Sequence, residues 1–126
     1  KKGNIFCIVG DGEANEGSIW ESLLIAVSNK LNNLIVIIDY NKSQIRSLEP
    51  NLNTKMFKSF GCDVALVDGH DVEQLIDSMS VFDKPKVVLA NTVKGKGIKE
   101  IEKDMFAWHH RAPTDEEYER FIEVIG

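Results

Sequence analysis

The chain has 126 residues, a hydrophobic content of 43% and a formal net charge of −5 at pH 7. This length suggests a single domain, and the apolar fraction suffices for a hydrophobic core. The acidic balance gives no reason to expect a nucleic-acid partner, and no apolar run approaches the roughly 20 residues of a membrane span. No signal peptide is visible. Because the chain starts with Lys1 and runs almost directly into a strand, we expect a piece of a larger protein.

Cysteine usage bears on the compartment. The two cysteines, Cys7 and Cys62, both lie in apolar, strand-like runs. We expect buried, reduced thiols rather than a disulfide pair, which favours a cytoplasmic setting.

The first third of the chain has the pattern strand, turn, helix and strand. A short apolar run over Asn4–Val9 predicts a strand, and Gly10-Asp11-Gly12 predicts a sharp turn. A helix is expected from about Glu13 to Lys30, with Asn15 available as its cap. Its apolar residues cover more than one stripe, so we expect one face on the sheet and the other on a partner chain or a further domain. The β-branched run Leu34–Ile38 predicts a buried parallel strand.

The remainder continues this alternation. Residues 40–53 predict a long ordered loop, and loops of this size are usually functional. We expect helices over 54–60, ended by Gly61, and over 72–82, capped by Asp71, with Val72, Leu75, Ile76 and Met79 on the inner face of the second. Strands are expected at 62–67 and 86–91. Residues 92–112 look irregular, and a last helix is expected from 113–115 onward, with an apolar stripe of Tyr118, Phe121, Ile122 and Ile125.

The order of elements predicts a fold class. Strands that alternate with helices indicate an α/β protein with a doubly wound parallel sheet. Four strands make a thin sheet for so much apolar helix surface, so we expect a partial domain with further strands upstream.

Two polar side chains follow the first two strands. Asp11 comes directly after the first strand, and Asn41, 30 positions later, follows the second. Ligands of open parallel sheets bind beyond the carboxyl ends of the strands. A carboxylate and an amide oxygen that converge there would suit a hard cation such as magnesium, which in turn would hold phosphate oxygens. Aspartate and asparagine are also common in plain turns.

A family resemblance rests on this spacing. GDG at a strand end followed about thirty positions later by Asn resembles the thiamine-diphosphate motif. Within that superfamily, GDGEANEGSIWE and KLNNLIVIIDYNKSQI closely resemble transketolases, especially those split into N- and C-terminal subunits. The resemblance covers nearly the whole chain and corresponds to the latter half of the diphosphate-binding domain.

The resemblance implies a metal site and a cofactor site. Asp11, Asn41 and Ser43, the last through its backbone carbonyl, match the ligands of magnesium (or calcium), which two diphosphate oxygens and a water would complete. Gly12 matches the glycine that approaches the diphosphate, where a Cβ would hinder contact. The other implied cofactor-binding residues are Gly10, Glu13 and Ile45; for Ile45, plain loop packing is an equal alternative.

Two further residues match residues that act in catalysis in the family. Glu16 matches a glutamate at the dimer interface that links two cofactor sites, although an acid in a first helical turn is ordinary. In WHHRAPTDEEYE, His109 matches the histidine that reaches the cofactor diphosphate and the substrate. His110 stands where the family has glycine, which puts the local backbone in doubt if that position needs positive φ.

Other features have weaker implications. Arg46-Ser47 stands where the family commonly has Asp-Gly, which leaves open a sugar other than the usual pentose phosphates. The turn at 68–71 is explained by its cap, and Lys94 and Lys96 fit a solvated loop better than a phosphate site.

The implied activity is two-carbon ketol transfer between sugar phosphates. The implied partners are a C-terminal transketolase subunit or a pyrimidine-binding domain, without which the chain would be inactive, in a homodimer or heterotetramer. Three alternatives stay open: a 2-oxo-acid dehydrogenase α subunit or deoxyxylulose-phosphate synthase, a catalytically incomplete binding or structural subunit, and a nucleotide-binding module, whose glycine fingerprints are missing.

Overall fold

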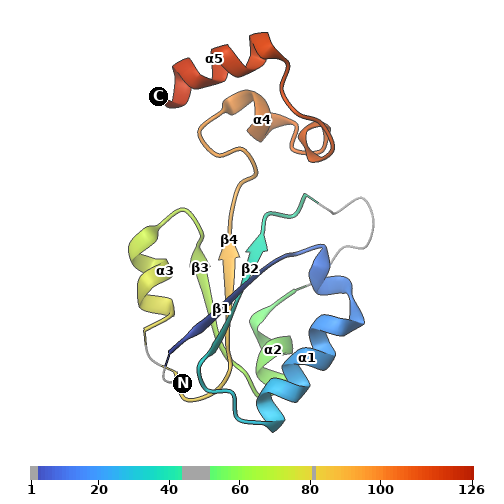
Figure 1. The fold of residues 1–126 in the computed structure, drawn as a ribbon, viewed down its shortest axis with the longest axis vertical. Helices are drawn as coiled ribbons and strands as arrows, with labels where there is room; N and C mark the ends of the chain where they lie inside the picture. The colour runs from blue at the N-terminus through green and yellow to red at the C-terminus, as the bar shows by residue number, and fades with distance from the viewer. Residues whose placement is uncertain (1–2, 44–51, 81) are drawn as a thin grey trace. The chain divides into compact units, whose positions relative to one another are not determined.

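A computed structural model describes residues 3–43, 52–80 and 82–126 (Figure 1). The chain divides into two compact units, Lys1–Thr92 and Val93–Gly126. The first unit holds the sheet and its helices. Its elements, in chain order, are β1 (Ile5–Gly10), a 3-10 helix (Glu13–Asn15), α1 (Gly17–Ser28), β2 (Leu34–Tyr40), α2 (Thr54–Ser59), β3 (Asp63–Asp68), α3 (Val72–Ser78) and β4 (Lys86–Asn91).

The strands form a parallel sheet in the order β1-β2-β4-β3. The steps from β1 to β2 and from β2 to β3 run in one direction across the sheet, and the step from β3 back to β4 runs in the other. Because such crossovers are right-handed, α1 and α2 share one face of the sheet and α3 covers the other (Figure 1). The predicted doubly wound α/β class is therefore confirmed.

The register brings the carboxyl ends of the strands to one edge. Gly10 on β1 pairs with Asp39 on β2, and Asn91 on β4 pairs with both Tyr40 and Asp68. The residues that follow the four strands therefore begin within one residue of the same level. This edge is where the sequence places its candidate ligands.

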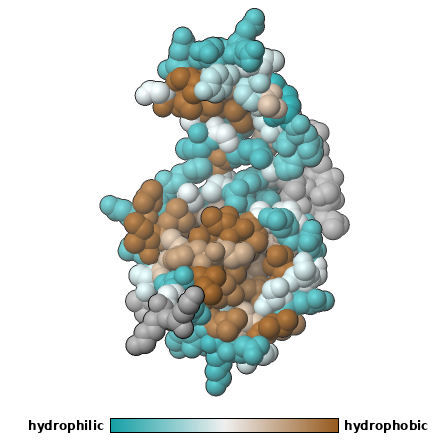
Figure 2. Space-filling model, viewed as in Figure 1, coloured by the Kyte–Doolittle hydropathy of each residue, from teal (hydrophilic) through white to brown (hydrophobic). Residues whose placement is uncertain are grey.

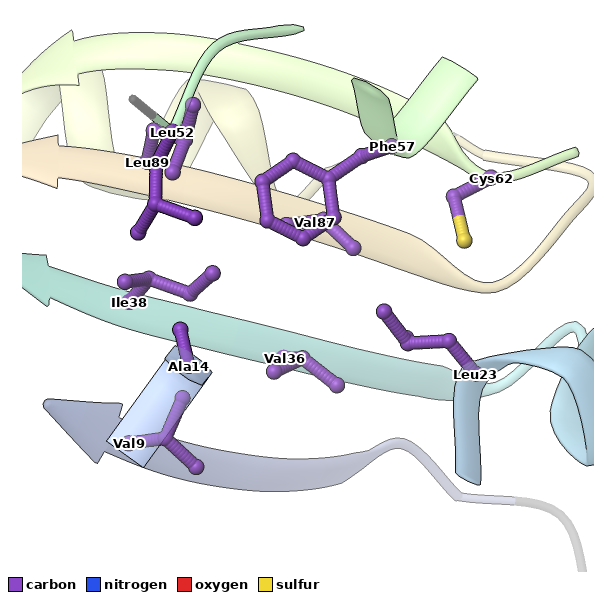
Figure 3. Close-up of a cluster of buried hydrophobic side chains, with 10 residues drawn as sticks. All are labelled: Val9, Ala14, Leu23, Val36, Ile38, Leu52, Phe57, Cys62, Val87 and Leu89. Atoms are coloured by element: carbon purple, nitrogen blue, oxygen red, sulfur yellow. The ribbon is translucent and has the colours of Figure 1, made fainter. Parts of the chain in front are cut away.

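The core of this unit lies between the sheet and the pair α1 and α2. Figure 3 shows its buried side chains, which come from three strands, both helices and the segments beside them: Val9, Ala14, Leu23, Val36, Ile38, Leu52, Phe57, Cys62, Val87 and Leu89. Phe57 of α2 is fully buried and stacks on Trp20 of α1, with ring centroids 5.0 Å apart. This stack joins the two helices over the sheet.

The edge strand β1 corrects one expectation. Cys7 is exposed, whereas Cys62 is buried. Among the described strands β1 pairs with β2 alone, and its apolar residues Ile5, Phe6 and Ile8 are all more than half exposed, Ile8 to 73%. Figure 2 shows apolar side chains gathered over β1 on the near face. Cys7 is therefore exposed because no described element covers this part of the edge strand.

The helices of this unit also differ from expectation at their ends and faces. Asn15 does not cap α1; it lies in the 3-10 helix, and Glu16 is the N-cap. α1 ends at Ser28 rather than Lys30, which adopts a positive φ of 53° and so leaves the helix. Its second apolar face is exposed at Leu24 and Ile25.

The end of α2 and the start of α3 agree with the sequence prediction, whereas the end and the inner face of α3 do not. Gly61 follows α2 with φ of 93°, as a helix-ending glycine should, and the Asp71 side chain caps α3 by accepting from the Gln74 N–H. α3 ends at Ser78 rather than near Phe82. Val72 and Ile76 are exposed, because this short helix meets the sheet mainly at β3, so the predicted inner stripe is half wrong.

The second unit is helical. It comprises α4 (Lys99–Lys103), a 3-10 helix (Ala107–His109) and α5 (Asp115–Ile125), so the segment predicted to be irregular holds two short helices. Thr114 caps α5 in a reciprocal capping box with Glu117. Of the predicted stripe on α5, Phe121 alone is buried. No helix in the described parts of the chain is long and apolar enough to cross a membrane.

The stack of Phe57 on Trp20 generates a prediction for stability. Phe57→Ala should lower the free energy of unfolding by about 3–5 kcal/mol, because it leaves a cavity between α1, α2 and the sheet. Chemical denaturation of the complete protein measures this loss. Met56→Ala, on the exposed side of the same helix, is the matched control and should cost far less.

Candidate functional site

Asp11 lies at the carboxyl edge of the sheet beside the segment that follows β2. It is buried, with an exposed fraction of 3%. Its N–H donates to the Asp39 carbonyl oxygen over 3.2 Å, which continues the pairing of β1 with β2 by one residue. Its Oδ2 atom accepts the Lys42 N–H over 2.6 Å. The structure therefore places the Asp11 carboxylate against the turn that follows β2, at the residue directly after Asn41.

The segment 41–43 is folded around its own side chains. The Asn41 Oδ1 atom accepts the Ser43 N–H over 2.8 Å, and Lys42 between them has a positive φ of 60°. Ser43 is buried, with an exposed fraction of 5%. This tight turn directs the Lys42 N–H at the Asp11 carboxylate and the Ser43 N–H at the Asn41 amide oxygen.

Asp39 holds the other end of the Asn41 amide. Its Oδ2 atom accepts the Asn41 Nδ2 group over 2.8 Å, and its Oδ1 atom accepts the Thr92 hydroxyl. Asp39 and Thr92 were not predicted as site residues. The signal was available in principle, because Asp39 ends the same strand that Asn41 follows, and Thr92 directly follows β4.

The turn after β1 is held by an acid within it. The Glu13 Oε2 atom accepts the Gly10 N–H over 2.6 Å, which ties the 3-10 helix to the strand end. Gly12 has φ of −64° and ψ of −44°, a conformation open to any residue. The backbone conformation at position 12 therefore does not require glycine. If glycine is needed at this position, the reason is an atom that comes close to its Cα.

Glu16 and Trp20 follow this turn. Glu16 is exposed and forms the N-cap of α1 without a side-chain cap hydrogen bond. Its exposure fits both expected roles, a glutamate at a dimer interface and an ordinary acid at the start of a helix. Trp20 donates its ring N–H to the Ala14 carbonyl oxygen over 2.9 Å and stacks on Phe57, so its place is structural.

In the second unit, His109 ends the 3-10 helix Ala107–His109. Next to it, the Arg111 guanidinium lies over the Trp108 ring, 3.6 Å from its centroid, and donates to both carboxylate oxygens of Glu117 over 2.8 and 2.9 Å. Trp108 in turn packs edge-on against the buried Phe121. This stacked ion pair fixes the turn that carries His109 to the start of α5.

His110 is unstrained. Its φ is −125°, so the position occupied by glycine in the family does not need positive φ here, and the doubt about the local backbone is removed. The His110 ring lies edge-on to that of His109, with centroids 4.5 Å apart.

Ile45, Arg46 and Ser47 lie outside the described residues. In residues 3–43, 52–80 and 82–126, no three His, Cys, Asp or Glu side chains gather as a metal cluster would. A metal at this edge would therefore depend on amide and backbone carbonyl oxygens as well as on Asp11.

The fold and this edge define an α/β protein with an oxygen-rich turn pair at the carboxyl ends of its strands, the usual position for a phosphate-bearing ligand. The model of the family described as "Transketolase, thiamine diphosphate binding domain" matches residues 2–122. The chain therefore belongs to the transketolase family, as a thiamine-diphosphate-binding domain.

Individual relatives agree with this assignment. The chain is 38% identical to one of the subunits of apulose-4-phosphate transketolase from Actinobacillus succinogenes, covering 98% of this chain and 48% of that protein. It is 34% identical to human transketolase, covering 96% of this chain and 20% of that protein. The crystal structure of transketolase from Campylobacter jejuni is similar with a TM-score of 0.70 and 34% identity, over 79% of this chain and 17% of that one. The chain thus spans about half the length of the Actinobacillus relative and about a fifth of human transketolase.

The ion pair beside His109 generates a pH prediction. The hydrogen bonds from Arg111, and next to them the one from the Thr114 N–H, lower the pKa of Glu117 from its ordinary 4.5 to about 2. Because the folded pKa is depressed, the pair stabilises the folded state above about pH 4.5, and this contribution is lost as the pH falls from 4.5 toward 2. Glu117→Gln should therefore lower the Tm at pH 7, and the deficit should shrink at about pH 3.

Thermal unfolding of the complete protein between about pH 7 and pH 3 measures this deficit. Glu119→Gln, at an exposed position on the same helix, is the matched control. A Tm deficit of Glu117→Gln that stayed constant across this range would contradict the assigned ion pair.

Proposed function

We propose that this chain is the magnesium- and diphosphate-binding part of a transketolase that transfers a two-carbon ketol unit between phosphorylated sugars. The observation that carries the proposal is the burial of the Asp11 carboxylate against residues 41–43 at the carboxyl edge of a parallel sheet. Membership of the transketolase family supports it.

The residues present suit magnesium. Magnesium prefers oxygen ligands and keeps several of its positions for water and substrate phosphate. Asp11 would supply a carboxylate oxygen, Asn41 its amide oxygen and Ser43 its backbone carbonyl. The hydrogen bonds from the Lys42 N–H to Asp11 and from the Ser43 N–H to the Asn41 amide oxygen are internal to the protein, so they support a turn that is held in place before any ligand arrives. Calcium, which accepts the same donors, is the second expected ion.

The diphosphate would lie at the turn that precedes α1. Gly10 and Gly12 present backbone without side chains there, and Glu13 holds the turn closed through the Gly10 N–H. The helix that follows favours negative charge near its start. Bound thiamine diphosphate would supply the electron sink for breaking and making the carbon–carbon bond. The chain's own part is to anchor and orient its diphosphate end, with Ile45 as the expected packing residue.

Substrate contact is assigned to the second unit. We propose that His109 reaches the cofactor diphosphate and the sugar, held by the stack of Trp108, Arg111 and Glu117. Glu16, exposed at the start of α1, is proposed to lie at a subunit interface. The partner would be a C-terminal transketolase subunit or a pyrimidine-binding domain, in a homodimer or heterotetramer. Two relatives are each named as one subunit of an apulose-4-phosphate transketolase, which supports a split arrangement.

The sugar itself is tested by turnover. Complete protein, with its partner, should convert a ketose phosphate donor and aldose phosphate acceptor rather than pyruvate. The assay compares two donors directly. One is xylulose 5-phosphate, with ribose 5-phosphate as acceptor, and the other is apulose 4-phosphate, which the relatives' names suggest. Turnover of pyruvate alone would place the chain in another branch of thiamine-diphosphate enzymes.

The metal site has a direct test. Asp11→Ala and Asn41→Ala should each abolish magnesium-dependent binding of thiamine diphosphate, because each removes an oxygen ligand of the ion. Calorimetry of the complete protein, with and without magnesium, measures this. Wild-type affinity in both variants would end the proposal for this site.

Gly12 tests the approach of the diphosphate. Because its φ of −64° and ψ of −44° are open to alanine, Gly12→Ala should leave the Tm unchanged and weaken thiamine-diphosphate binding about tenfold or more through the added Cβ. Gly17→Ala is the matched control, since a Cβ at Gly17 meets nothing within 4 Å. Equal affinity in the two variants would show that no ligand approaches Gly12.

A further inference from the structure

We propose that Asp39 and Thr92 are positioning residues that orient the Asn41 amide so that its oxygen, and not its nitrogen, is presented to the metal. This inference rests on the proposed function of the site. It concerns residues that lie at the carboxyl edge of β2 and β4 and are not themselves among the assigned ligands.

An amide has two ends of similar shape and opposite hydrogen-bonding character. The oxygen accepts, and the nitrogen donates two hydrogens and cannot ligate a cation. Rotation of the Asn41 side chain by half a turn about its last bond would therefore replace a ligand with two hydrogens that repel the ion. A site that uses asparagine needs something that distinguishes the two ends.

Asp39 makes this distinction. Its carboxylate has no hydrogen to donate when ionised, so only the nitrogen end of the Asn41 amide can bind it, which it does over 2.8 Å. The Ser43 N–H reinforces the choice, because it donates to the oxygen end over 2.8 Å. With both ends specified, the amide has one orientation.

Thr92 in turn fixes Asp39. Its hydroxyl donates to Oδ1 of Asp39, which leaves Oδ2 for the Asn41 amide. Its N–H donates to the Tyr40 carbonyl oxygen over 3.4 Å, which places Thr92 beside the end of β2. The contact between Asp39 and Thr92 thus joins the end of β2, which Asn41 follows, to the end of the neighbouring strand β4.

Gly69 makes room for Thr92. A Cβ on Gly69 would overlap Thr92 Cγ2 and lie 3.2 Å from the Ala90 Cβ, so a side chain there would displace the threonine. Gly69 therefore has a role beyond the turn between β3 and α3. Gly69 thus leaves space for Thr92, Thr92 binds Asp39, and Asp39 binds the Asn41 amide.

The closing experiment measures metal affinity rather than activity. Mn²⁺ is titrated into the complete protein at saturating thiamine diphosphate, and bound Mn²⁺ is followed by its electron paramagnetic resonance spectrum. Asp39→Ala should weaken Mn²⁺ binding about 10- to 100-fold, the usual effect of losing a partner that orients a metal ligand. Thr92→Val and Gly69→Ala should weaken it in the same direction, and Thr92→Ser, which keeps the hydroxyl, should retain it.

A rescue separates orientation from direct contact. In the Asn41→Asp background both ends of residue 41 are oxygens, so no orientation is needed. Adding Asp39→Ala there should cause no further loss, and adding Asp39→Asn instead should give binding at least as tight, because its amide nitrogen can donate to the new carboxylate. Further weakening by Asp39→Ala in this background would show that Asp39 acts directly on the ligands, and would overturn the proposal.

Controls distinguish this proposal from the one on which it rests. Asp77→Ala, at an exposed aspartate of α3, should leave Mn²⁺ binding unchanged. Thermal unfolding without metal or cofactor shows that each variant folds. If Asp11→Ala weakens binding and Asp39→Ala does not, the positioning role alone is wrong; if Asp11→Ala binds Mn²⁺ as tightly as the unaltered protein, both proposals are wrong.

Discussion

The hydrogen bond from the Lys42 N–H to the Asp11 carboxylate is the contact on which the candidate site depends. It joins two turns that are 31 positions apart in sequence, and it does so at a buried carboxylate, where a charge-assisted bond is strong. The parallel register of β1 and β2 brings the two turns to the same level, and the positive φ of Lys42 directs its N–H inward. Sheet register and turn geometry together therefore create an oxygen-rich edge that neither would create alone.

Much of this edge was predictable because parallel sheets obey simple rules. The buried runs before Asp11 and Asn41, and the helix between them, required the two residues to emerge on the same edge. The cap at Asp71, the glycine stop at Gly61 and the start of the last helix at 113–115 were also predictable, since each depends on local backbone chemistry.

Other features depend on neighbours that a one-dimensional pattern does not contain. Cys7 lies in an apolar run like that of a central strand, but β1 is at the edge of the described sheet, and the exposure of Cys7 follows from this strand order. Val72 and Ile76 follow helical spacing, yet α3 meets the sheet mainly at β3. Asp39 and Thr92 are 53 positions apart, and their contact exists only because β4 pairs with β2. Spacing within one βαβ unit could not have shown it.

The strand order gives this last contact a consequence for assembly of the protein. Among the described strands β4 comes last in the sequence, yet it lies inside the sheet, between β2 and β3. Asp11 and Asn41 belong to the first βαβ unit, which can pair locally, whereas Thr92 arrives only when β4 has inserted between strands made before it. The Asp39–Thr92 contact therefore requires the pairing of β2 with β4, so the surroundings of Asn41 are complete only in the closed sheet.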